Sequence, residues 1–436
     1  MFEIVSTLDL RIGMFVSELD RPWLDSPFLM QGFLVEDTEQ LATLRNLCRF
    51  VTVDRTRSIG DEYRADDMIF VPEKRAPFVP APRPVVHYES KRKLKLPRLV
   101  ISETAREVGH HKFAPVVYAD DVRIEEELPA AKVSYENTQK LLEDITEQVS
   151  AGKVPDIEHV DRTVDGLVEC VVRNADALLW MSRLKRTDNE TYDHALSVSI
   201  HLMAFGRNLG LPPDELHDLG MGGLLKDVGF IQLPTELVHK AGGLTPAERS
   251  QMHQHVQLGC ELLARDFAMP DAVFDIIVKH HERIDGSGYP AHLTGDEIGL
   301  YPEMAGVVDS YCAMSYPRAY RPARNPQWVI DEINAMRDTR FTASVVDEFI
   351  QFVGLYPVGT LVELNSGEVA AVYEQNRVRR MKPRVMILLG PDKSRNLTPG
   401  ILNLLNDPLV RDGVPYQIVR VLPAGSFGLD AKEFYL

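Results

Sequence analysis

Cysteine is scarce in this chain of 436 residues, which contains only Cys48, Cys170, Cys260 and Cys312. These cysteines form no CxxC pair and no dense disulfide framework, so a reducing compartment is favoured. Long hydrophobic runs are also lacking, and no stretch approaches the roughly 20 apolar residues that a membrane-spanning helix needs. The opening sequence MFEIVSTLDL has two acidic residues and no basic one, which argues against a secretory signal. We therefore expect a cytoplasmic protein without a membrane span.

Basic residues are also fewer than acidic ones. The chain has 48 Lys and Arg against 64 Asp and Glu, which gives a formal net charge of −16. Such an excess of negative charge disfavours a general affinity for duplex nucleic acid or anionic membranes. An anionic ligand would therefore need a cation supplied locally.

The length and the distribution of motifs indicate several domains. Residues 1–75 combine short strand-like runs with one amphipathic helix and predict a small α+β module. Residues 76–128 are rich in proline and contain the basic run SKRKLKLPR, which we interpret as a solvated linker rather than a nucleic-acid or lipid patch. Residues 129–356 show helical periodicity and predict a helical bundle, and residues 357–436 predict a β-rich appendage.

The most informative segment is HHERIDGSGYP at residues 280–290. Adjacent histidines on a helix point in different directions, so packing alone does not explain a pair that runs directly into a glycine-rich turn. Upstream, Glu190 and His194 are four residues apart and lie on one helical face. Taken alone, Glu190 could be a solvated helix residue and Asp309 a helix N-cap. Together, His, Asp and Glu side chains on successive helices are typical of metal sites in bundle cores.

This region resembles the HD-GYP family, bacterial phosphodiesterases that hydrolyse the second messenger cyclic di-GMP. The resemblance covers residues 188–323 and implies an all-α, HD-type helical bundle. Residues 1–75 resemble a domain of unknown function that is often joined to HD-GYP domains. The matching motifs are the signature at 280–290, LLKDVG at 224–229, LTPAERSQMHQHVQLG at 244–259 and RAYRPA at 318–323.

The resemblance also implies the residues of the site. Asp227 and Lys226 stand at the catalytic pair of the family, and the bound ions would be iron, manganese, zinc or nickel. The implied metal ligands are Glu190, His194, Asp227, His255, His280, His281 and Asp309. The implied substrate contacts are Gly286, Gly288, Tyr289, Pro290, Arg318 and Arg321.

Four residues depart from the family pattern. Lys226 replaces a histidine, Phe230 a lysine, Met304 an arginine and Cys312 an aspartate. A protonated lysine has no lone pair, so it does not bind metal. At about 4 Å and an effective dielectric near 20, its raw repulsion with a divalent ion is on the order of 8 kcal/mol.

Two interpretations of Lys226 follow. Its ammonium group could pair with Asp227 and Asp309 in place of one ion, which would leave a single-ion centre. Alternatively, its stem could pack while its charged end reaches solvent. Cys312 is expected to be a small core residue rather than a nucleophile.

Two functions therefore remain open at this level. The first is a metal-dependent phosphodiesterase that hydrolyses cyclic di-GMP to the linear dinucleotide or GMP in bacterial signalling, with activity reduced by the departures. The second is a catalytically degenerate effector, which would bind cyclic di-GMP or a signalling protein through the loop at residues 286–290. The sequence does not indicate an oligomeric state.

Overall fold

The computed structural model forms two compact units, residues 1–98 and residues 99–436. It describes residues 2–7, 10–19, 33–35, 38–48, 50–54, 58, 115–120, 122–184, 190–240, 242–263, 269–316, 323–377, 379–396, 398–411 and 413–429. None of the helices in these described ranges has the length and apolar character required to cross a bilayer.

The described residues of the first unit form an antiparallel sheet and one helix, as expected for a small α+β module. The sheet has the strand order β1-β4-β2-β3. Val16, Val51 and Val53 of this sheet are buried together with Leu44 of the helix. Residues two apart on a strand share a face, so Val51 and Val53 both point into this small core. The elements are β1 (Phe2–Ser6), β2 (Phe15–Leu19), β3 (Phe33–Leu34), α1 (Thr38–Leu47) and β4 (Phe50–Asp54).

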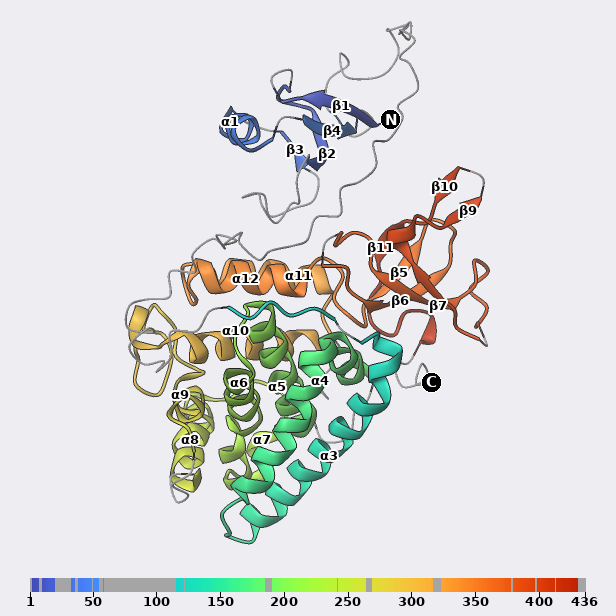
Figure 1. The fold of residues 1–436 in the computed structure, drawn as a ribbon. Coiled ribbons are helices and arrows are strands. Elements are labelled where there is room, and N and C mark those ends of the chain that lie inside the picture. The colour runs from blue at the N-terminus through green and yellow to red at the C-terminus, as the bar shows by residue number, and fades with distance from the viewer. Residues whose placement is uncertain are drawn as a thin grey trace, which may run out of the picture. The chain divides into compact units, whose positions relative to one another are not determined.

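The second unit is mainly helical (Figure 1). Its apolar positions follow the helical period, as in α9, where Val273, Ile276 and Ile277 are buried on one face. The HD-type helical bundle predicted from the sequence is confirmed. The long helices are α3 (Ile124–Ser150), α4 (Ile157–Leu184), α5 (Glu190–Asn208), α6 (Pro213–Leu225), α8 (Pro246–Leu263), α9 (Asp271–Lys279), α10 (Leu300–Ser315), α11 (Pro326–Ala335) and α12 (Ala343–Val353). The short ones are η3 (Val228–Gln232), α7 (Thr235–Val238), η4 (Gly295–Glu297), η5 (Leu404–Asn406) and η6 (Ser426–Gly428).

Helix α3 begins earlier than the sequence suggested. Its first residue, Ile124, lies inside the segment that we interpreted as linker. Glu125, Glu126 and Glu127 occupy the first turn, where negative charge stabilises a helix through its dipole. This acidic run is a helix-start signal that the proline-rich composition of the preceding segment obscured.

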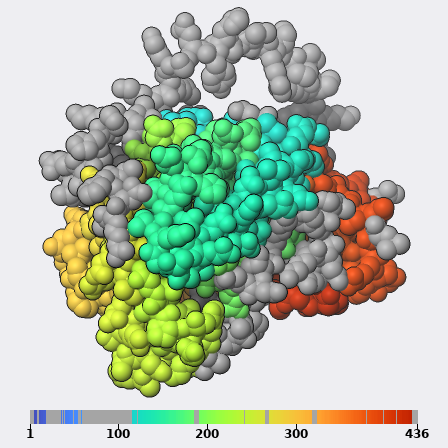
Figure 2. All heavy atoms as spheres, turned by 90° about the horizontal axis from the view of Figure 1, so that it is seen from below, coloured from blue at the N-terminus to red at the C-terminus, as the bar shows by residue number. Residues whose placement is uncertain are grey.

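The C-terminal strands form an antiparallel sheet of order β11-β5-β6-β7-β8, with a separate β9–β10 hairpin. Figure 2 shows these strands, in red, at one side of the helical body. They share its core, because Tyr373 packs edge-on against Trp180 of α4 with ring centroids 5.1 Å apart. The strands are β5 (Leu361–Leu364), β6 (Val369–Glu374), β7 (Arg384–Leu389), β8 (Ile401–Asn403), β9 (Leu409–Arg411), β10 (Val414–Pro415) and β11 (Ile418–Val421). The tail is therefore β-rich, as predicted.

Candidate metal centre

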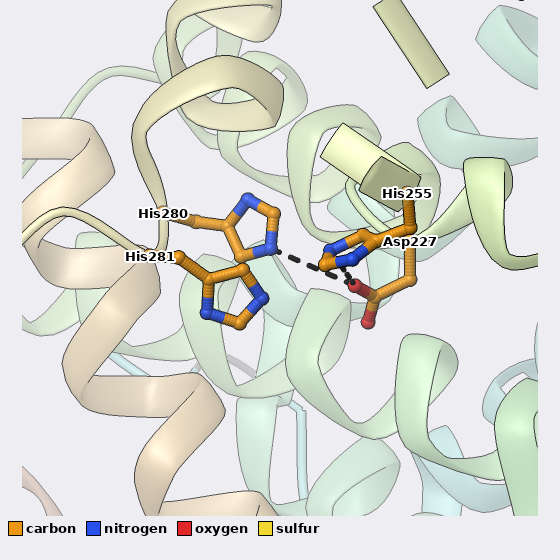
Figure 3. A group of neighbouring side chains, drawn as sticks. All are labelled: Asp227, His255, His280 and His281. Carbon is orange, nitrogen blue, oxygen red and sulfur yellow. Dashed lines mark ion pairs between the residues drawn. The ribbon is translucent and has the colours of Figure 1, made fainter. Parts of the chain in front are cut away.

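Four side chains that are distant in the sequence meet inside the helical bundle (Figure 3). Asp227 lies between α6 and η3, His255 lies within α8, and His280 and His281 directly follow α9. Each offers one ligand atom, and these four atoms lie within 4.8 Å of one another. The structure thus gathers four of the seven expected ligands into one cluster, which we call the four-ligand cluster.

Close backbone packing brings Asp227 and His255 together. At Gly229, a Cβ atom would lie 1.9 Å from the carbonyl oxygen of His255 and 2.6 Å from the backbone nitrogen of Gly259. Only a residue without a side chain fits in that space. Gly229 therefore lets the segment that carries Asp227 lie directly against α8.

The hydrogen bonds of two imidazoles fix which nitrogen faces the cluster. Nδ1 of His255 donates to the carbonyl of Met252 at 2.8 Å, and Nδ1 of His280 donates to the carbonyl of Ile277 at 3.0 Å. The Nε2 atom of each ring therefore carries a lone pair in the neutral form. Both Nε2 atoms lie 3.6 Å from Oδ1 of Asp227.

These three atoms are buried and have no hydrogen-bond partner within the described part of the chain. Burial lowers the pKa of His255 to about 4, so its imidazole is neutral at pH 7. Unpartnered lone pairs that converge in a buried place are costly, because buried polar groups are normally satisfied. A divalent cation bound between Asp227, His255 and His280 would satisfy all three.

A second cluster adjoins the first and already contains a positive charge. It consists of His194, Asp227 and Asp309. Lys226 pairs with Asp227, and its Nζ lies 2.7 Å from Oδ1 of Asp309. Nε2 of His194 lies 2.8 Å from the same oxygen.

The Lys226 side chain is 1% exposed, so the alternative in which its charged end reaches solvent is wrong. Burial alone would lower the pKa of Lys226, but Asp227 and Asp309 raise it above its usual value. Burial alone would also raise the pKa of each aspartate, yet Lys226 holds both well below their usual range. All three groups are therefore charged at neutral pH.

The remaining expected ligands and the residues that depart from the family pattern lie in the following places. Glu190 is half-buried at the first residue of α5 and belongs to neither cluster. Asp309 lies well inside α10, so the N-cap interpretation is wrong. Met304 and Cys312 are buried in the same helix, which agrees with the core role expected for Cys312. Phe230, at the position of an expected lysine, stacks on His255 with ring centroids 3.9 Å apart.

The loop after the paired histidines is held by a buried carboxylate. Glu282 is 2% exposed and accepts hydrogen bonds from the backbone nitrogens of Ala291 at 2.6 Å and Leu293 at 3.0 Å. Gly288 is buried, and a Cβ there would lie 2.4 Å from the backbone nitrogen of Arg283. The packing of the loop therefore requires a glycine at this position.

The other residues expected to contact substrate differ in their burial and in their contacts. Gly286 is half-buried with a positive φ of 75°, and Pro290 is exposed. Tyr289 stacks on His281 with ring centroids 4.5 Å apart. Arg318 and Arg321 lie outside the described residues.

Two residues at the site were not expected from the sequence. Nothing in the sequence pattern indicated a role for Glu282, although it directly follows the paired histidines. His253 lies two residues from His255, so the helical pattern predicts that it faces away from the site. In the structure its ring stacks on Tyr289 with centroids 3.6 Å apart. A helical-face argument does not detect a partner that comes from a distant loop.

Comparison with known proteins gives two family matches. A family model described as an HD domain matches residues 176–345, and one described as a domain of unknown function (DUF3391) matches residues 4–160. The second match extends well beyond the 75 residues that the sequence motifs suggested.

Curated relatives differ in how much of their length is matched. The chain is 30% identical over 389 residues to cyclic di-GMP phosphodiesterase PA4108 of Pseudomonas aeruginosa, covering 89% of this chain and 85% of that protein. It is 28% identical over 163 residues to 3'3'-cGAMP-specific phosphodiesterase 2 of Vibrio cholerae, covering 37% of this chain and 31% of that protein. It is 34% identical over 146 residues to cyclic di-GMP phosphodiesterase response regulator RpfG of Xanthomonas campestris, covering 33% and 38%. The chain thus spans most of the first relative and less than half of the other two.

Proposed function

This chain belongs to the HD-GYP family of phosphodiesterases, and we propose that it hydrolyses cyclic di-GMP to the linear dinucleotide or GMP with a divalent metal ion. The observation that carries this proposal is the convergence of three buried, unpartnered atoms, Oδ1 of Asp227 and Nε2 of His255 and His280. A phosphodiester is anionic, and water is a poor nucleophile at neutral pH. A bound divalent ion lowers the pKa of its water ligand and offsets charge on the phosphoryl group.

The four-ligand cluster suits a transition metal. It offers three imidazoles and one carboxylate, Asp227. Imidazole ligands favour zinc, iron or nickel, and a carboxylate also suits manganese. We therefore propose iron, manganese, zinc or nickel as the resident ion.

We propose one such ion per chain. The second cluster could otherwise hold an ion between His194, Asp227 and Asp309, but the Lys226 ammonium pairs with both carboxylates. An ammonium and a divalent ion at adjacent positions repel strongly in a buried site. Lys226 therefore takes the place of a second ion.

The choice among cyclic dinucleotides is supported by the relatives. The relative matched over 85% of its length is a cyclic di-GMP phosphodiesterase, whereas the 3'3'-cGAMP-specific one is matched over 31%. We propose a role in second-messenger signalling in the bacterial cytoplasm, with Tyr289 and its neighbours in the loop contacting substrate or a signalling protein.

The degenerate-effector alternative is not favoured. Its basis was the replacement of family residues by Lys226, Phe230, Met304 and Cys312. Three of these side chains have taken structural roles, namely the stack of Phe230 on His255 and the burial of Met304 and Cys312 in α10. The four-ligand cluster is complete without them, so the departures do not remove the means of binding a metal.

A turnover assay on anaerobically purified protein tests the proposal. Cyclic di-GMP and 3'3'-cGAMP would each be incubated with protein loaded with Mn²⁺ or Fe²⁺, and products separated by chromatography. We expect faster turnover of cyclic di-GMP and about one metal ion per chain by elemental analysis. The control variant His280→Ala should lose both metal and turnover, because it lacks a ligand. Binding of cyclic di-GMP without turnover under every metal would favour the effector function instead.

A further inference from the structure

The paired histidines are oriented in different ways. Nδ1 of His280 donates to a backbone carbonyl, as does Nδ1 of His255 in α8. The imidazole of His281 makes no hydrogen bond with any residue that the structure describes. Metal-binding histidines are normally oriented by a hydrogen bond from the second ring nitrogen. Something other than a hydrogen bond must therefore orient His281.

Ring contacts supply that orientation, from His255 and His280 inside the cluster and from Tyr289 outside it. Tyr289 stacks on His281 with an interplanar angle of 24° and a centroid distance of 4.5 Å. His253 stacks on Tyr289 almost in parallel, at 4° and 3.6 Å. One helix, one loop and the end of another helix thus contribute rings to a continuous stack, which ends at a candidate metal ligand.

The backbone of the loop strengthens this arrangement. The backbone nitrogen of Tyr289 donates to the carbonyl oxygen of His281 at 3.2 Å. The carboxylate of Glu282 holds the next residues of the loop through Ala291 and Leu293. These bonds fix the main chain of the loop but not the plane of the Tyr289 ring. The face-to-face contact from His253 fixes that plane.

We propose that His253 is a positioning residue, which holds Tyr289 against His281 and thereby orients this imidazole for metal binding. The inference rests on the proposed function in one respect, that an ion binds in the four-ligand cluster. A stack needs a flat ring and no proton transfer, so phenylalanine should replace His253 and alanine should not.

Co²⁺ binding to the full chain tests this. Affinity would be measured by competition with a chelator, and the visible absorption spectrum of bound Co²⁺ would report its coordination. We expect His253→Ala to weaken Co²⁺ binding roughly three- to tenfold, the range that the loss of one aromatic stack implies, and to change the spectrum. His253→Phe should restore both to within about twofold of the unmodified chain. Gln254→Ala, an exposed neighbour on α8, is the matched control and should change neither.

Two results would overturn the inference. Unchanged Co²⁺ affinity and spectrum in His253→Ala would mean that the stack does not orient His281. Equal weakening in His253→Phe and His253→Ala would mean that His253 acts through its nitrogens. Because Co²⁺ binding is measured without substrate, failure of the chain to hydrolyse cyclic di-GMP would count against the proposed function alone.

Discussion

A buried lysine held between a buried aspartate and a partly buried one is a demanding arrangement. Removing ions from water costs several kcal/mol each, and their attraction offsets that cost only when each charge has a well-placed partner. Lys226 meets this condition, because it pairs with Asp227 and Asp309. Removing one partner of such a group typically costs about 3–5 kcal/mol. The charge at this position therefore contributes to the stability of the folded chain.

Replacing Lys226 by histidine should change the metal content. Lys226→His removes the ammonium and supplies a lone pair beside Asp227 and Asp309, so a second ion can bind. We expect elemental analysis to rise from about one toward two ions per chain, with faster turnover because a second ion assists activation of water. Two tightly held ions in the unmodified chain would show instead that Lys226 does not compete with metal.

The buried His201 should make stability depend on pH. Its Nδ1 donates to the carbonyl of Ser197 at 2.7 Å, and burial lowers its pKa to about 3. In the unfolded chain its pKa is about 6.5, so between these values the unfolded state binds more protons. Stability contributed by His201 is therefore complete above pH 6.5 and is lost as the pH falls.

This dependence can be isolated with one variant. His201→Asn keeps a donor for Ser197 but does not titrate. Between pH 7.5 and pH 5, the unmodified chain should lose about 2 kcal/mol more unfolding free energy than the variant. Urea unfolding at the two pH values measures the difference, and equal losses in both proteins would contradict the prediction.

At the scale of elements, the approach of η3 to α8 brings Asp227 and His255 together. Gly229→Ala would place a methyl group 1.9 Å from the carbonyl oxygen of His255, so the two elements must separate. We expect a loss of about 3 kcal/mol in unfolding free energy and weaker metal binding. Gly259→Ala is a matched control in the same contact, because its nearest neighbour would be 3.4 Å away. Equal effects of the two changes on stability and metal content would argue against this view of the contact.

Much of the fold and part of the candidate site could be predicted from the amino-acid sequence. Strand-like patterns predicted the β-rich tail, and apolar periodicity predicted the helices of the bundle. The pair His280 and His281 stood out because two adjacent histidines before a glycine-rich turn have no packing explanation.

Other features depend on distances that no local pattern encodes. The sequence left two environments open for the Lys226 ammonium group, because a long side chain can reach either solvent or a neighbouring carboxylate. Its burial in the structure decides between them. The contact of His253 with Tyr289 joins α8 to a loop beyond α9, so it follows from tertiary packing alone.

At the scale of the whole molecule, residues 1–98 and 99–436 form separate compact units. Helices and C-terminal strands within the second unit share a core, in which Trp180 packs on Tyr373. The Asp176 carboxylate of α4 also accepts a hydrogen bond from the backbone nitrogen of Gln375 at 2.8 Å. The strands are thus integral to the fold of the second unit, while the boundary at residue 357 remains a prediction.

Truncation tests this division. A chain lacking residues 1–98 should fold cooperatively and keep its metal, because the four-ligand cluster and its supporting helices lie in the second unit. A chain ending at residue 356 should be strongly destabilised, since it exposes Trp180 and leaves Asp176 without its partner from Gln375. Thermal unfolding and elemental analysis measure both outcomes. Loss of metal in the first truncation, or full stability in the second, would contradict the division.

The ammonium of Lys226 also bears on the order in which the protein matures. With Lys226 in place, two buried carboxylates retain one net negative charge instead of two, before any metal arrives. Folding therefore does not have to wait for a metal to relieve their mutual repulsion. The charges of Lys226, Asp227 and Asp309 thus permit the core to form before a metal ion binds.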